Sequence, residues 1–168
     1  MQSEEFKNLQ APLKDKYRAQ PESAIIILKA EGKISEGISC RVQTGKALVQ
    51  AGLHPATGGD GLLACSGDML LEALVACAGV TLRAVSTAIG VEIKDGIIKA
   101  EGDLDFRGTL GVSKDVPVGF KTIRLHFDLV TDATAEQLET IAKLTERYCV
   151  VYQTLTKGVS VGTSYNKM

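Results

Sequence analysis

The chain has 168 residues, of which 45% are hydrophobic and 23% are charged, and its formal net charge is −1. This balance is typical of one globular domain and excludes a disordered or fibrous chain. Because Lys and Arg do not gather into a basic stripe that could offset phosphates, nucleic-acid binding is excluded as well.

The N-terminal stretch indicates the compartment. Residues 1–17 are polar and lack the basic start and apolar run of a signal peptide. Charged residues and glycines interrupt the apolar stretches, so we expect no membrane span. Four cysteines without a signal peptide indicate the reducing cytoplasm, where thiols are reactive or buried rather than permanently bridged. We expect residues 1–22 to form an arm or short helix and residues 23–168 to form a single domain.

Short β-rich stretches open the predicted domain. The pattern predicts strands over 24–30, 34–42 and 47–52, with turns at 31–33 and at Gly45–Lys46. Links this short favour an antiparallel meander. Residues 54–61 are a loop by composition, since Gly58, Gly59 and Gly61 fall within its last four positions.

A long apolar segment over residues 66–90 predicts a helix. Ser66 is the expected N-cap, and Asp68 and Glu72 suit the positive end of the helix dipole. Gly90 is typical of the C-terminal end of a helix. Between these ends the segment is apolar nearly all round, so we expect a central, buried helix.

The second half of the chain continues with strands and one more helix. Residues 91–106 predict a hairpin or a long bent strand, 108–119 a loop, and 120–130 a strand with one wet face. Thr134 and Gln137 form a capping box for a helix that runs to about residue 148, or on to 155. Residues 159–164 suit a last strand.

The element order predicts an α+β fold with antiparallel sheets and the two helices packed together on one face. A helix that is apolar all round is hard to cover within so small a domain. We therefore expect a partner subunit.

Cys77 and Cys149 carry the candidate chemistry, because one lies in the apolar helix and the other at the end of the second helix. Taken alone, each reads as a small core residue, since free cysteines are commonly buried. The functional reading is a redox pair, in which one thiolate attacks a peroxide and the sulfenic acid condenses with the second thiol. The sequence has no C-x-x-C motif.

Residues 68–77, Asp-Met-Leu-Leu-Glu-Ala-Leu-Val-Ala-Cys, resemble the first cysteine helix of the OsmC/Ohr family. Residues 148–155, Tyr-Cys-Val-Val-Tyr-Gln-Thr-Leu, occupy the place of its second cysteine motif. The glycine loop before the helix and residues 118–123 fit too. The likeness covers roughly residues 35–164.

The resemblance implies an OsmC-like fold with two central helices, an intertwined homodimer and active sites at the interface. It implies a peroxidase that reduces organic hydroperoxides, with Cys77 as the peroxidatic and Cys149 as the resolving residue. A thiol or dithiol would be the reductant, with no metal and no cofactor. The alternative is a non-enzymatic dimer of the same fold that binds a small hydrophobic or thiol ligand.

Family members also place an Arg beside the reactive thiol and a carboxylate that orients it. Arg41 is the first candidate for the Arg, ahead of Arg107 and Arg147. Asp68 is the candidate carboxylate, with Glu72 as the fallback.

This chain departs from the family pattern at two places. The proline that usually follows the second cysteine is Val150, and the usual Glu is Asp68. Asp68 is also about 13 Å along the helix from Cys77, so it would act through an Arg or across a dimer interface.

The remaining candidate residues are explained without a catalytic role. Cys40 and Cys65 match no family role and are expected to be buried or incidental thiols. A zinc site from His54, Cys65, Cys77 and Cys149 has spacings that fit no ligand pattern. His126 is expected on the solvent-exposed face of a strand.

Overall fold

The computed structural model describes residues 31–35, 39–44, 47–111 and 113–167, with a few positions before residue 21. Over residues 31–48 only the backbone and its pairing are described. The strand expected over 24–30, the turn at Gly45–Lys46 and most of the expected N-terminal arm lie outside the described residues.

The first three strands of the N-terminal sheet form an antiparallel meander, but their bounds differ from those expected, because the single strand predicted over 34–42 is divided between two strands that pair with each other. β1 (Glu31–Ser35), β2 (Ser39–Thr44) and β3 (Ala47–Gly52) pair in chain order. The turn expected at 31–33 is wrong, because this stretch is part of β1 and pairs residue by residue with β2. β4 (Ala64–Cys65) then adds to β3 in parallel and leads directly into the long helix.

The apolar segment forms helix α2 (Ser66–Ala88). Cys65, not Ser66, is the N-cap, and its side chain makes no capping hydrogen bond. One side of α2 is buried and carries Leu74, Ala78, Leu82 and Val85, spaced three or four residues apart. The opposite side is open in the single chain, where Val80 is 73% exposed. The helix is therefore half covered rather than buried all round.

By length and composition α2 could cross a membrane, although its sequence contains charged residues. Its buried side packs against the strand β5 (Ile93–Asp103) and against two further helices, α4 (Ala135–Tyr148) and α5 (Val150–Lys157). We therefore assign α2 as the core helix of the fold.

A long hairpin covers α2. β5 (Ile93–Asp103) and β6 (Thr122–Thr131) pair antiparallel, with one register shift near the start of β5. Ile123, Leu125, Phe127 and Leu129 alternate with exposed polar residues and pack toward the helices. His126 lies on the exposed face, as expected.

Two short helices interrupt the loops. These are η2 (Pro55–Thr57) and α3 (Phe106–Thr109), where the sequence predicted only loop and strand end. The His54 ring stacks on the Phe106 ring with centroids 5.0 Å apart, which joins the two segments. Added to Gly108, a Cβ atom would come within 2.7 Å of the backbone oxygens of Val116 and Pro117, so this glycine lets the loop close.

The last helical region is broken at Cys149. α4 (Ala135–Tyr148) begins with the predicted capping box, in which Thr134 Oγ1 accepts from the Gln137 N–H at 3.2 Å. α5 (Val150–Lys157) follows after one extended residue, Cys149. The last strand, expected over 159–164, is absent from the described chain. Val159 and Val161 are 69% and 81% exposed, and this segment pairs with no strand among the described residues.

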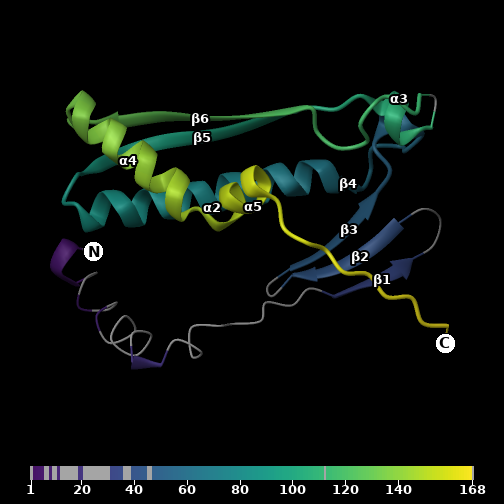
Figure 1. Cartoon of the computed structure of the whole chain (residues 1–168), viewed down its shortest axis with the longest axis horizontal. Coiled ribbons are helices and arrows are strands. Elements are labelled where there is room, and N and C mark those ends of the chain that lie inside the picture. Colours follow the sequence, from purple (N-terminus) through teal and green to yellow (C-terminus); the bar gives the residue numbers. More distant parts are fainter. Residues whose placement is uncertain are drawn as a thin grey trace.

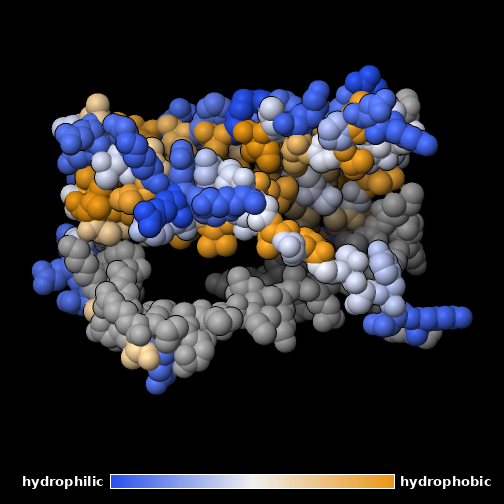
Figure 2. Space-filling view, viewed as in Figure 1, coloured by the Kyte–Doolittle hydropathy of each residue, from blue (hydrophilic) through white to orange (hydrophobic). Residues whose placement is uncertain are grey.

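The elements form layers around α2 (Figure 1). The hairpin runs along one side of α2, and α4 and α5 lie against the helix on another. Figure 2 shows hydrophilic residues over the outer side of the hairpin and a band of hydrophobic residues below it. The structure thus combines helices with small sheets, and its core lies between the hairpin and the helices.

Candidate functional site

The structure brings Cys77 and Cys149 together. Cys77 lies in the middle of α2, and Cys149 lies at the junction of α4 and α5. Cys149 is only 1% exposed and packs with Leu74 and Ala78 in a core cluster that Cys77 borders. The two side chains interact by a hydrogen bond, and both thiols are free. Two thiols in contact are the starting point for a disulfide.

Hydrogen bonds from α5 favour the thiolate of Cys77. Burial raises the pKa of this thiol, but the backbone N–H groups of Val151 and Val150, with the side chains of Cys149 and Thr81, outweigh it. The resulting pKa of Cys77 lies below the ordinary thiol value. Val150 and Val151 are the first residues of α5, whose N–H groups have no partner within the helix. The break at Cys149 therefore aims unpaired donors at the Cys77 sulfur.

The interaction between the two thiols has the opposite effect on the pKa of Cys149. Burial raises the pKa of the Cys149 thiol, and the Tyr152 N–H offsets only part of this effect. The negative charge that develops on Cys77 raises it further. The pair is thus unequal, because the Cys77 thiol loses its proton at a lower pH than the Cys149 thiol does.

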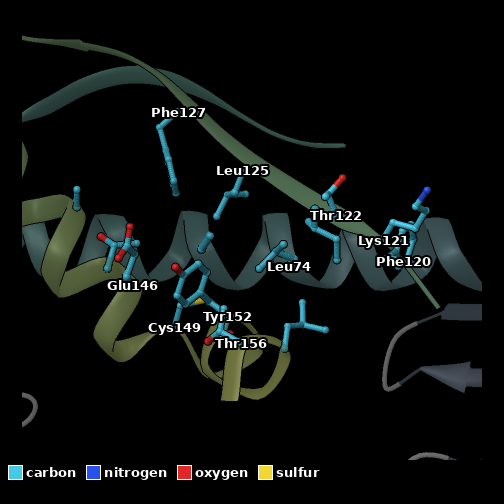
Figure 3. A pocket seen from close by; sticks show the side chains of 15 residues that line it. Leu74, Phe120, Lys121, Thr122, Leu125, Phe127, Glu146, Cys149, Tyr152 and Thr156 are labelled. Carbon is cyan, nitrogen blue, oxygen red and sulfur yellow. Dashed lines mark hydrogen bonds between the residues drawn. The ribbon is translucent and has the colours of Figure 1, made fainter. Parts of the chain in front are cut away.

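An apolar groove of about 540 Å³ has Cys149 in its wall (Figure 3). Residues of α2, β6, α4 and α5 line the groove, and Cys149 is among them. Cys77 is not among the described residues that line it. In Figure 3, Tyr152 stands beside Cys149, with Leu74 and Leu125 nearby. The lining is Leu74, Ala78, Phe120, Lys121, Thr122, Ile123, Leu125, Phe127, Ala142, Thr145, Glu146, Cys149, Tyr152, Leu155 and Thr156.

Thr145, one of the lining residues, carries a buried polar atom. It lies one helical turn before Cys149 in α4 and is 3% exposed. Its hydroxyl oxygen is buried and has no hydrogen-bond partner within the part of the chain that the structure describes. A buried hydroxyl without a partner costs free energy, so a bound ligand or water that paired with it would be favoured.

The supporting arginine and carboxylate are not assembled by the described side chains. Arg41 lies in β2 opposite Gln50 of β3, and only its backbone is described. The alternative Arg107 is engaged by Asp105, with 2.6 Å between Nη2 and Oδ2. Arg147 lies over the Tyr148 ring at 5.6 Å. These contacts give Arg107 and Arg147 other partners and leave Arg41 as the first candidate.

Asp68 lies in the exposed first turn of α2, and Glu72 is exposed one turn later. Because α2 is continuous from Ser66 to Ala88, Asp68 stays about 13 Å along the axis from Cys77. The structure thus places Asp68 away from the thiol pair of its own chain.

The zinc alternative is not supported. Among residues 47–111 and 113–167, no group of three or more His, Cys, Asp or Glu side chains could hold a metal ion. His54 packs on Phe106, and its Nδ1 accepts a hydrogen bond from the Ala56 N–H at 3.0 Å. Cys65 is a half-buried free thiol at the start of α2.

Both thiols could be predicted from the sequence, whereas the groups around them could not. The donors at Val150 and Val151 are backbone atoms that depend on a helix break, which no Gly or Pro signals. Thr145 did carry a signal, because it precedes Cys149 by four residues and thus shares its helix face.

Comparison with known proteins points to one family. The family model described as OsmC-like protein matches residues 59–164, well over half of the chain. No curated protein matches the chain significantly in sequence.

Solved structures share the fold. An OsmC-like protein from Mycoplasma pneumoniae has a TM-score of 0.66 at 16% identity, with 80% of this chain and 89% of that chain covered. An organic hydroperoxide resistance protein from Legionella pneumophila has a TM-score of 0.62 at 16% identity, with 79% and 91% covered. The organic hydroperoxide resistance protein OhrB of Bacillus subtilis has a TM-score of 0.54 at 18% identity, with 80% and 93% covered. At sequence identities this low, the TM-scores establish a common fold and nothing more specific.

Proposed function

The chain belongs to the OsmC-like family, and on that premise we propose that it is a thiol-dependent peroxidase that reduces organic hydroperoxides. Two structural relatives are described as organic hydroperoxide resistance proteins, which supports this substrate class. The apolar residues around both thiols suit an organic peroxide better than hydrogen peroxide.

The proposed chemistry starts at Cys77. Its thiolate attacks the outer oxygen of the hydroperoxide, the O–O bond breaks, and the alkoxide leaves and takes up a proton to become an alcohol. Cys77 is then a sulfenic acid. The Cys149 thiol attacks that sulfur, water leaves, and a Cys77–Cys149 disulfide remains.

The unequal pair is the observation that carries this proposal. A thiolate is the nucleophile, and the pKa of Cys77 is lowered while that of Cys149 is raised. The contact between the two side chains would let the disulfide form without a large rearrangement. A structural pair of core cysteines would need neither the α5 donors nor this difference in pKa.

We infer three further features from the family. The active form is a homodimer with its sites near the interface, a thiol or dithiol regenerates the enzyme, and the reducing cytoplasm is its compartment. Arg41 is proposed to hold the Cys77 thiolate, and Asp68 to orient an Arg across the interface. The open side of α2 beside Cys77 supports the interface position.

Two cysteine variants test the proposal. Cys77→Ser is expected to abolish consumption of an organic hydroperoxide, because serine is a poor nucleophile at neutral pH. Cys149→Ser is expected to reduce one equivalent and then stop as a sulfenic or sulfinic acid. Cys65→Ser is the matched control and should turn over normally. Mass spectrometry of the wild type should show a bridge between the peptides of Cys77 and Cys149.

The groove favours one alternative, a non-enzymatic protein that binds a small hydrophobic or thiol ligand. The same experiment separates the two functions. If peroxide leaves both thiols free, or bridges another pair of cysteines, the peroxidase proposal is wrong and the binding function replaces it.

A further inference from the structure

The first turn of α5 presents three backbone N–H groups that have no carbonyl partner within the helix. They belong to Val150, Val151 and Tyr152, the first three residues of α5. The sulfurs of Cys77 and Cys149 are their acceptors. The division of these donors between the two sulfurs therefore affects which thiol reacts.

This division follows from the position of Cys149 as the N-cap of α5. The side chain of an N-cap residue reaches the N–H groups of the second and third helical residues. The Cys149 sulfur accordingly interacts with the N–H groups of Val151 and Tyr152. The first N–H, that of Val150, stays free for an acceptor from another element, and it donates to Cys77 of α2. Val150 is thus the donor directed at Cys77, Tyr152 is the donor directed at Cys149, and Val151 is shared.

Val150 is free to act on Cys77 because the fold uses neither its N–H nor its side chain. The side chain is 68% exposed, and the N–H lies at the start of the helix, where no intrahelical hydrogen bond forms. The family pattern has a proline at this position, and proline has no N–H to donate. This chain therefore has a donor beside Cys77 that the usual proline would not supply.

Neutral groups act most strongly on Cys77. Besides the donors of α5, its hydrogen-bond partners are the side chains of Thr81 and Cys149, of which Cys149 is titratable. The hairpin packs the apolar side chains of Leu125 and Phe127 against this cluster. The titratable residues nearest along the three helices are Glu72, Arg83, Glu146, Arg147, Tyr148, Tyr152 and Lys157. None of these seven side chains is among the groups that act most strongly on Cys77, so the difference between the two thiols depends on hydrogen bonds.

We propose that Val150 is a catalytic residue of this chain, because its backbone N–H binds the sulfur of Cys77 and makes Cys77, rather than Cys149, the attacking thiol. This inference rests on the proposed function, which supplies the hydroperoxide. The N–H donates to the Cys77 thiolate while the sulfur gives an electron pair to the outer peroxide oxygen. The O–O bond breaks, the alkoxide leaves and takes a proton from water, and Cys77 is oxidised to the sulfenic acid.

Backbone esters in the full-length chain test this role, because an ester replaces one N–H by oxygen and keeps the side chain. Cys149 permits their synthesis, since a peptide of residues 149–168 that begins with this cysteine can be ligated to a thioester of residues 1–148. One protein carries the ester at Val150, and a second carries it at Tyr152, whose N–H acts on Cys149. The control is the all-amide protein assembled in the same way.

The readout is the ratio of alkylation at Cys77 to alkylation at Cys149 after brief treatment with iodoacetamide, measured by mass spectrometry. Loss of a hydrogen bond to a charged group lowers the thiolate population about tenfold, and the higher nucleophilicity of a less acidic thiolate restores about threefold of this. We therefore expect the Val150 ester to lower the ratio at pH 7 by about three- to tenfold. The Tyr152 ester should raise the ratio.

A second measurement separates the donor from packing. At a pH where Cys77 is fully ionised, its alkylation should be faster in the Val150 ester than in the all-amide control, because a thiolate with fewer donors is the better nucleophile. A loss of packing alone would not produce this crossing of the two rate-versus-pH curves.

Recombinant variants repeat the comparison. Val150→Pro removes the same N–H, and the position tolerates proline because it is the first of a helix and follows the extended Cys149. The proline ring also crowds the sulfur, so the ratio should fall at least as far as in the ester. Ala135→Pro makes the same change at the first position of α4, after the extended Thr134, and should leave the ratio unchanged.

An unchanged ratio in the Val150 ester, or a change of the same sign in both esters, would overturn the inference. The same proteins are also mixed with cumene hydroperoxide, which the Val150 ester should consume more slowly than the control at pH 7. If the control consumes no hydroperoxide, the proposed function fails, while a lowered alkylation ratio still supports the action of Val150 on Cys77. If control and ester consume hydroperoxide equally fast and the ratio is unchanged, the peroxidase proposal stands and the role of Val150 is wrong.

Discussion

The lowered pKa of Cys77 depends mainly on partners that are distant in the sequence. The N–H groups of α5 and the Thr81 side chain oppose the effect of burial on its pKa. No described cation is among the groups that lower this pKa. Among the described residues, only hydrogen bonds stabilise the Cys77 thiolate, and a charged partner would add to them.

Thr81→Val tests the hydrogen-bond contribution. The variant removes one donor to the sulfur, so the pKa of Cys77 should rise and less thiolate should be present at neutral pH. Alkylation of Cys77 by iodoacetamide should slow at pH 7, and its rate-versus-pH curve should move to higher pH. Thr87→Val makes the same change farther along α2 and serves as the control. Identical curves for both variants would contradict the role of Thr81.

Arg41→Ala tests the charge contribution that the family resemblance implies. If this Arg contacts the thiolate in the assembled protein, its loss should raise the pKa of Cys77 and slow alkylation at neutral pH. Arg107→Ala is the control, since that side chain is paired with Asp105. A change in Arg107→Ala alone would transfer the role to Arg107.

At the level of elements, the break between α4 and α5 determines the site. Cys149 is extended, with φ −73° and ψ 109°, so α5 starts anew and presents its first N–H groups to Cys77. Gln153 holds the junction, because its Nε2 donates to the Glu146 carbonyl at 2.7 Å. That carbonyl belongs to the last turn of α4, where intrahelical partners are lacking.

Gln153→Ala should therefore weaken both the fold and the site. We expect a loss of about 1 kcal/mol in the free energy of unfolding, measured by urea denaturation. The alkylation rate of Cys77 should also fall, because the α5 donors are held less firmly. Thr154→Ala changes an exposed neighbour on α5 and should leave that rate unchanged. A stability loss with an unchanged alkylation rate would show that Gln153 supports the fold without positioning the donors.

The sequence predicted those elements whose signals are local. α2, β3 and the capping box of Thr134 follow from periodicity, strand composition and cap chemistry. The bounds of β1 and β2 were predicted wrongly, because residues 31–33 were expected to be a turn. The break at Cys149 could not be predicted, because Tyr148 to Val151 contain no helix breaker and the break depends on tertiary packing. The strand expected over 159–164 has strand-like alternation but no described neighbour to pair with. The thiol pair was predictable only through the family motifs, since spacing alone does not bring Cys77 to Cys149.

At the scale of the molecule, the single chain leaves apolar surface that a partner could cover. Leu70 and Val80 are exposed on the open side of α2, next to Ala73 and Ala76. Within the described residues, β5 and β6 form a two-stranded sheet with free edges, and such a sheet is marginal by itself. Both features support the proposal that the open side of α2 is the interface between two copies of the chain.

We therefore expect a homodimer that buries well over about 2,000 Å², with a mass twice the 17.9 kDa of one chain in light scattering at micromolar concentration. Val80→Lys should weaken it by about 3 kcal/mol, roughly a hundredfold in Kd, because the new charge would be buried without a partner. Val130→Lys is the matched control, since Val130 lies 56% exposed on the charged outer face of β6 and should leave the mass unchanged. A monomeric wild type would contradict the dimer. A dimer broken by Val130→Lys and not by Val80→Lys would move the interface from α2 to the outer face of the hairpin.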